Sequence, residues 1–189
     1  MATLFALGYG STSSIALRNI LQAGYVGALA TATADTWATE LGVFSPQQPR
    51  LITTGKPVPV GTSGGVTSLG TGASAAGAFF LGVVFWLLQR CHRAYSTLPL
   101  IAFMSGLLGS LFDSLLGATI QAVYYCPACD KETERQVHSC GTETQLRRGL
   151  HWMNNDVVNF LATLVGGLVA MVAYGSARKR FPSNILHGS

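Results

Sequence analysis

Charge is scarce in this chain of 189 residues, of which only 11% are Asp, Glu, Lys or Arg. Ordinary soluble domains contain about 25%, so a soluble cytosolic enzyme is excluded for lack of charge to cover its surface. Intrinsic disorder is excluded as well, because 49% of the residues are hydrophobic. The net charge of +4 comes from scattered basic residues and forms no basic stripe for a nucleic acid. The composition indicates a membrane protein.

Long uncharged runs supply the candidate membrane spans. Residues 68–89 and 157–175 contain no charge, and residues 98–122 contain only Asp113. Each run is long enough to cross a hydrocarbon core about 30 Å thick. A shorter run at 20–34, rich in Ala, Gly and Thr, is a weaker fourth candidate. The predicted fold is an all-α polytopic transmembrane helix bundle that forms a single integral membrane domain over residues 1–189.

Basic residues suggest an orientation for this bundle. Arg90 and Arg93 follow the first strong span, and Arg178 to Arg180 follow the last. Two spans separate these groups, so both should lie on one side, which the positive-inside rule makes cytoplasmic. In a bacterial cell this would be a multi-pass protein of the plasma membrane. The polar loops described next would then lie on the opposite side.

Polar chemistry gathers after the weak first span, in residues 34–42 and 49–67, which their glycines and prolines predict to be loops. A turn at 61–65 can direct successive backbone N–H groups at an anion, with positive charge from Arg50 and Lys56. No Lys-Ser or Lys-Thr follows the glycines, so this is not a Walker loop. Two interpretations stay open, a Gly/Pro connector and a phosphate cradle made of Arg50, Lys56, Gly61, Thr62, Ser63, Gly64 and Gly65.

Asp113 is an acid inside a predicted span. It shares one helical stripe with Gly106, Gly109 and Gly117, and small residues on one face let helices approach closely. Its carboxylate should therefore point into the bundle, where a charge is costly unless it is paired or bound to metal. The alternative is a protonated side chain that makes a structural hydrogen bond.

A second polar group precedes the last span and consists of Asn154, Asn155, Asp156 and Asn159. An Asn or Asp before an apolar run is commonly a helix N-cap. A cap accounts for one such residue, whereas four of them favour a substrate-binding surface.

The loop between the last two spans contains Cys126, Cys129, His138 and Cys140. A CxxC pair followed by two more soft ligands fits a tetrahedral zinc site. Zinc would be structural here, because protein ligands fill all four positions. A disulfide or spare thiols are the alternatives.

Several of these blocks occur together in one known family. Residues 30–42, 50–67, 109–118 with Gln121, and 154–159 resemble, in the same order, the transmembrane protein 19 family, also called the family of domain of unknown function 92. The resemblance extends from about Arg18 onward. Members of that family are usually longer at the N-terminus, so the resemblance predicts that this chain is N-terminally truncated.

The resemblance also implies a chemistry. The plant branch of the family includes phytyl-phosphate kinase, which uses a nucleoside triphosphate to convert an isoprenoid monophosphate to the diphosphate. The implied protein is an isoprenoid-phosphate kinase with a lipid substrate, a nucleotide and Mg²⁺, a cation that prefers carboxylates and phosphate oxygens. The predicted catalytic residues are the acids in or beside the spans, namely Asp35, Glu40, Asp113 and Asp156. Asp113 and Asp156 would also bind Mg²⁺.

Two considerations bear on this hypothesis. Asp35 and Glu40 would point about 140° apart on a continuous helix, so they face one ligand only if the helix ends between them. A transporter or lipid-flipping protein is the rival function, because acids in a small-residue bundle also describe a substrate or proton pathway. The loop with Arg50, Lys56 and Gly61 discriminates between the two, since a phosphate cradle serves a kinase.

Overall fold

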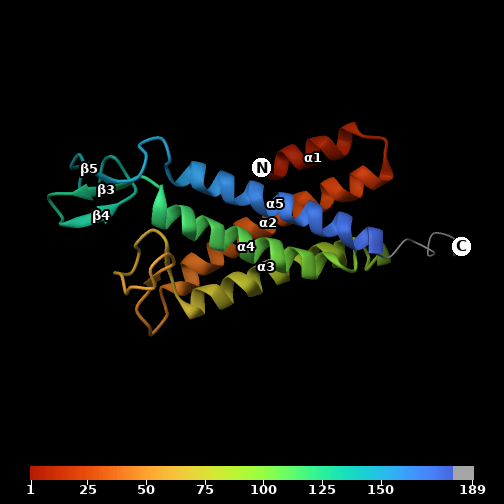
Figure 1. Cartoon of the computed structure of the whole chain (residues 1–189), viewed down its shortest axis with the longest axis horizontal. Coiled ribbons are helices and arrows are strands. Elements are labelled where there is room, and N and C mark those ends of the chain that lie inside the picture. Colours follow the sequence, from red (N-terminus) through yellow and green to blue (C-terminus); the bar gives the residue numbers. More distant parts are fainter. Residues whose placement is uncertain (181–189) are drawn as a thin grey trace, which may run out of the picture.

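The structure is a computed structural model that describes residues 1–180. The last part of the predicted domain, 181–189, lies outside the described residues. Helices dominate, as predicted, and five α-helices form an elongated bundle (Figure 1). The helices are α1 (Ala2–Ser11), α2 (Ile15–Gly42), α3 (Ser68–Leu88), α4 (Leu98–Thr119) and α5 (Asn155–Arg180), and a short 3₁₀ turn spans Arg93–Tyr95.

Helix α2 contacts each of the other four helices, and small residues make these contacts close. A Cβ added at Gly27 of α2 would lie 2.7 Å from the carbonyl oxygen of Gly166 in α5. A Cβ at Gly109 of α4 would overlap the buried side chain of Thr31, which donates a hydrogen bond of 2.9 Å to the Gly27 carbonyl. The bundle therefore packs backbone against backbone, as helices do in membranes.

Helices α3, α4 and α5 are the three helices of the described chain that are long and apolar enough to cross a membrane. They match the predicted spans 68–89, 98–122 and 157–175, although α4 ends at Thr119. Large apolar side chains such as Phe80, Leu108 and Val172 are exposed on them, where lipid can cover them. The weaker candidate at 20–34 lies within α2, which is not one of the three.

One prediction about α2 is wrong. Residues 34–42 were expected to form a loop, but α2 continues through them to Gly42. The prolines and most glycines of this region follow Gly42, so nothing interrupts the helix before it. The hydroxyls of Thr36 and Thr39 donate to carbonyls one turn earlier, at 2.9 and 3.0 Å, so these polar side chains are satisfied within the helix.

Two small antiparallel sheets cover one end of the bundle (Figure 1). In the first, β1 (Arg50–Leu51) pairs with β2 (Gly65–Val66). The second has the order β4-β3-β5, with β3 at Val123–Cys126, β4 at Lys131–Thr133 and β5 at Gln145–Arg148. This end, here called the polar end, also holds the C-terminal ends of α2 and α4 and the beginnings of α3 and α5.

The opposite end of the bundle holds the connection between α3 and α4 and the end of α5 (Figure 1). Arg90 and Arg93 lie in that connection, and Arg178 lies in the last turn of α5. The basic groups therefore share one end, as the sequence predicted.

Candidate functional site

A cavity of about 410 Å³ opens at the polar end of the bundle. Its lining comes from five parts of the chain: the last turns of α2, the turn at 61–65, the first turns of α3, the second half of α4 and the start of α5. Glu134 enters from the segment that follows β4. The cavity thus gathers residues that are far apart in the sequence.

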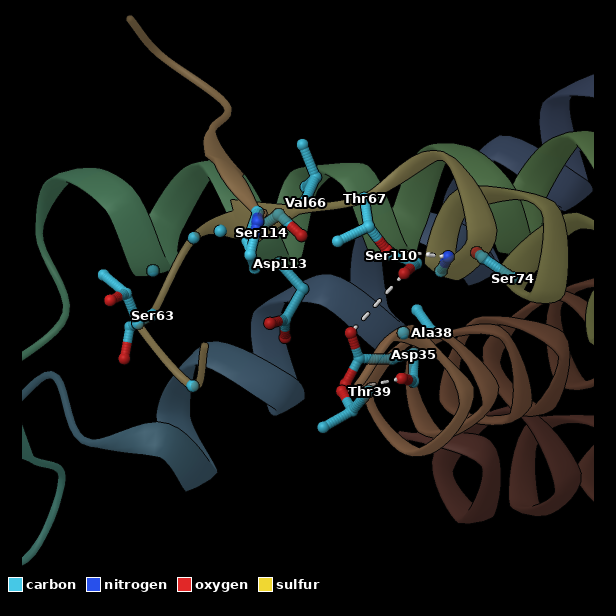
Figure 2. Close-up of a pocket in the computed structure, with 18 of the residues that line it drawn as sticks. Asp35, Ala38, Thr39, Ser63, Val66, Thr67, Ser74, Ser110, Asp113 and Ser114 are labelled. Atoms are coloured by element: carbon cyan, nitrogen blue, oxygen red, sulfur yellow. Dashed lines mark hydrogen bonds between the residues drawn. The ribbon is translucent and has the colours of Figure 1, made fainter. Parts of the chain in front are cut away.

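Two carboxyl groups lie side by side in this cavity, Asp35 from α2 and Asp113 from α4 (Figure 2). Both residues are half-buried. Asp35 Oδ1 accepts a hydrogen bond of 3.5 Å from the hydroxyl of Ser110. Within the described part of the chain, Asp113 Oδ2 and the hydroxyl of Ser74, which also line the cavity, are buried and have no hydrogen-bond partner. Buried polar atoms are rarely left unpaired, so this pattern points to a ligand.

Glu40 also lines the cavity, although it is exposed. Helix α2 does not end between Asp35 and Glu40, so the two side chains leave the helix in different directions. Asp35 points into the cavity near Asp113 (Figure 2), whereas Glu40 is an exposed residue of the lining. Of the predicted catalytic acids, the structure therefore brings Asp35, Glu40 and Asp113 to one cavity.

Asp156 is the predicted acid that the structure does not bring to the cavity. It is exposed in the first turn of α5 and is not part of the lining. A negative charge in the first turn favours a helix through its dipole, which accounts for Asp156 structurally. Asp113 and Asp156, the predicted Mg²⁺ pair, therefore do not line the same cavity.

Glu134 is the acid that sequence reasoning missed. Its Oε1 accepts hydrogen bonds from the hydroxyl of Ser63 at 2.7 Å and from Nε2 of Gln121 at 2.9 Å. These bonds hold an exposed carboxylate at the mouth of the cavity. The chain places Glu134 among other acids of a polar loop, and no local signal distinguishes it from them.

The turn at 61–65 lies against the cavity, as a phosphate cradle would. Gly61 and Gly64 have positive φ angles of 86° and 81°, and a side chain at Gly64 would overlap Ala118 of α4. The turn is closed by a hydrogen bond of 2.9 Å from Gly65 N–H to the Thr62 carbonyl. The backbone at Gly64 therefore approaches α4 too closely for a side chain, and the positive φ angles at both positions favour glycine.

The predicted cations of the cradle lie elsewhere. Lys56 is exposed and outside the lining, and Arg50 is used within its own loop, where its Nη1 donates to the Gly55 carbonyl at 2.8 Å. The guanidinium beside the turn belongs to Arg148 of β5. It donates to the carbonyls of Ser63 at 3.3 Å and Gly117 at 3.0 Å, and so links β5, the turn and α4.

Two helices begin at the cavity. Thr67 caps α3 by accepting a hydrogen bond of 2.9 Å from Gly70 N–H. Asn154 caps α5 in the same way, through Val157 N–H at 3.0 Å, so the capping interpretation holds for this residue. Asn155 and Asn159 line the cavity. Helix N-termini carry partial positive charge and attract anions such as phosphate.

The predicted Cys/His ligands also come together, in the segment that follows α4. The ligand atoms of Cys126, Cys129, His138 and Cys140 all lie within 4.8 Å of one another. The Cys126 and Cys140 sulfurs are 3.7 Å apart, and all four cysteines of the described chain are free. Hydrogen bonds with the Thr142 hydroxyl and the His138 ring lower the pKa of Cys140, while the hydrogen bond with Cys140 raises the pKa of Cys129. The thiolate is the form that binds metals.

The model of one protein family, Integral membrane protein DUF92, matches residues 1–167. The chain belongs to this family. This match confirms the family resemblance seen in the sequence. The assignment as an integral, multi-pass membrane protein is confirmed as well, because the family is described as an integral membrane protein and three helices are long and apolar enough to cross a membrane.

The curated relatives that the chain matches are longer than it. It is similar to "Protein PGR" of Arabidopsis thaliana, with 36% identity over 159 residues, 79% of this chain and 54% of the relative. "Uncharacterized membrane protein MJ0933" of Methanocaldococcus jannaschii is 34% identical over 151 residues, covering 80% and 50%. "Protein VTE6, chloroplastic" of Arabidopsis thaliana is 29% identical over 159 residues, covering 83% and 39%.

The chain thus spans about half the length of the first two of these relatives. No solved structure matches it significantly.

Proposed function

We propose that the cavity is a Mg²⁺-dependent phosphoryl-transfer site, at which an isoprenoid monophosphate in the membrane receives a phosphoryl group from a nucleoside triphosphate. The observation that carries this proposal is the buried, unpartnered Oδ2 of Asp113 beside the carboxyl group of Asp35. The family resemblance supplies the class of substrate.

The two carboxyl groups of the cavity support the proposal of a divalent cation. Neighbouring carboxylates repel each other unless a cation lies between them, and Mg²⁺ is usually held by one or two carboxylates together with phosphate oxygens and water. Asp35 and Asp113 would hold the ion, and Glu134 at the cavity mouth adds a third negative charge. When bound, Mg²⁺ neutralises the phosphate charge that develops during transfer.

Other groups of the cavity suit a phosphate. The beginnings of α3 and α5 and the glycine-rich turn surround the carboxylates, so an anion could meet helix dipoles and backbone N–H groups next to the cation. In phosphoryl transfer the protein mainly positions the reactants and supplies positive charge. The cavity supplies the positioning, and Arg148 keeps the turn in place.

The location of the cavity suits a lipid substrate. Ser74 in the second turn of α3 lines the cavity, and Phe79 and Phe80 further along α3 are exposed apolar side chains of a candidate membrane span. A phosphorylated headgroup could enter the cavity at the polar end while its isoprenoid chain stays among lipid tails. The transporter hypothesis differs in one measurable respect, because it requires no nucleotide to be consumed.

The test is a transfer assay with the full chain reconstituted in liposomes, γ-labelled nucleotide and isoprenyl monophosphates. We expect labelled diphosphate only when Mg²⁺ is present. Asp113→Asn, which is nearly isosteric, should insert normally and lose about 100-fold or more of the rate. Asp156→Asn is the matched control, because Asp156 is exposed and outside the cavity. Full activity in Asp113→Asn, or lipid movement without nucleotide turnover, contradicts the proposal.

A further inference from the structure

The segment of residues 123–148, here called the Cys/His segment, has almost no hydrophobic core. Only Val123, Tyr124 and Cys126 of its residues are buried, whereas Val137 and Leu146 are 55% and 46% exposed. Its three strands are three or four residues long. Segments this small generally need a disulfide or a metal to stay folded. The cysteines are free, so the structure has to be held in another way.

Potential metal ligands converge within this segment. Cys126 ends β3, Cys129 lies in the turn to β4, and His138 and Cys140 lie in the loop before β5. The loop folds back on itself, since His138 N–H donates to the Thr142 carbonyl at 3.0 Å and Gly141 has a φ of +84°. Three sulfurs and one imidazole nitrogen within 4.8 Å of one another are a complete donor set for tetrahedral zinc.

The same segment carries Glu134 to the cavity. Along the chain, Glu134 lies between Cys129 and His138, so an ion bound to both would close the loop on either side of it. The Glu134 carboxylate then meets Ser63 and Gln121 at the cavity mouth. An exposed side chain on a loop without a core would otherwise move freely, because little burial opposes its conformational entropy.

We propose that Cys126, Cys129, His138 and Cys140 bind one Zn²⁺ and that this ion positions Glu134 at the mouth of the cavity. The zinc is structural, because the protein supplies all four ligands. The inference does not rest on phosphoryl transfer, since it concerns the shape of the cavity whatever reaction occurs there.

Metal content tests the first half. The full chain, purified in detergent and dialysed against a weak chelator, should retain one zinc per chain by elemental analysis. Cys140→Ser should lose most of this zinc, and Cys91→Ser, the matched control, should lose none because Cys91 is exposed and outside the cluster. Absence of zinc from the wild-type chain, or a disulfide within the cluster, overturns the proposal.

Hydrogen exchange tests the second half without relying on a variant that could fail to fold. Removing zinc from the wild-type chain with a strong chelator should raise amide exchange at 123–148 and also at the turn 61–65. The middle of α4 should stay protected. Glu134→Gln should raise exchange at 61–65 by itself while zinc content stays at one per chain. If the turn does not respond to zinc removal, zinc does not position Glu134. Both readouts need no substrate, so they stand apart from any failure of the transfer assay.

Discussion

Replacing Glu134 by Gln tests whether the cavity binds a divalent cation. The change keeps the size of the side chain and removes one negative charge. Two opposing effects follow without metal. Hydrogen bonds from Ser63 at 2.7 Å and Gln121 at 2.9 Å lose their charged acceptor, at a cost of about 1 kcal/mol. The substitution also removes the repulsion between the exposed Glu134 carboxylate and Asp35 and Asp113, which stabilises the folded chain by a similar free energy. The unfolding midpoint without added Mg²⁺, with the Cys/His segment intact, should therefore move by less than about 4 °C.

With metal present, the variant should differ from the wild type. At a Mg²⁺ concentration of about 100 times Kd, binding stabilises the folded chain by about 2.7 kcal/mol, or roughly 5–10 °C in a chain of this size. Because two unit charges 4 Å apart attract by about 1 kcal/mol in water, losing the Glu134 charge should weaken the binding of a divalent ion by on the order of 1 kcal/mol. Glu134→Gln should thus raise Kd about tenfold and lose about half of the Mg²⁺-induced shift.

The assay is a thermal melt of the detergent-solubilised chain, followed by tryptophan fluorescence across a Mg²⁺ titration. Glu132→Gln is the matched control, because Glu132 lies in the same segment, is paired with Arg147 at 3.3 Å and does not line the cavity. It should keep the full Mg²⁺ shift. The reasoning is refuted if the wild type shows no shift with Mg²⁺, or if Glu134→Gln keeps all of it.

Two further predictions concern packing and orientation. Gly109→Ala should lower the free energy of unfolding by about 1–3 kcal/mol, because the added methyl group overlaps Thr31. The control Gly72→Ala meets no atom within 4 Å and should be neutral or stabilising. Equal melting midpoints of the two variants would contradict the close packing of α2 and α4. Nucleotide use requires the polar end to face the cytoplasm, which is the reverse of the positive-inside prediction. Cys91 is exposed in the connection between α3 and α4, at the opposite end of the bundle, and would then face outward. A membrane-impermeant maleimide should therefore label Cys91 from outside intact cells. Labelling only after permeabilisation would place the cavity on the wrong side for a kinase.

The features that the sequence predicted correctly depend on local patterns. Span length and lack of charge locate α3, α4 and α5 within a few residues, because a helix in lipid must satisfy its own backbone. The spacing of the cysteines and His138 predicted their convergence for a similar reason, since all four lie within a short loop. The inward position of Asp113 was predicted from the small residues on its helix face, and Asp113 lines the cavity.

The features that the sequence did not predict depend on contacts between distant segments. Glu134 meets Ser63 across 71 positions of the chain, and no local pattern encodes that contact. Arg148 reaches Ser63 across 85 positions and takes the place expected of Arg50 and Lys56. Asp156 was grouped with the cavity acids because an acid just before a span is typical both of the first turn of a helix and of a binding site. Only the folded structure shows which of these two positions Asp156 occupies.

The most direct measurement of the central claim uses Mn²⁺ in place of Mg²⁺ and records electron–nuclear double resonance on the reconstituted chain. If Asp35 and Asp113 hold a cation against a phosphate, adding nucleotide or isoprenyl monophosphate should produce a ³¹P coupling to the bound Mn²⁺. The coupling should disappear in Asp113→Asn and persist in Asp156→Asn. Bound Mn²⁺ without any ³¹P coupling, or coupling that survives Asp113→Asn, would contradict a phosphoryl-transfer site in this cavity.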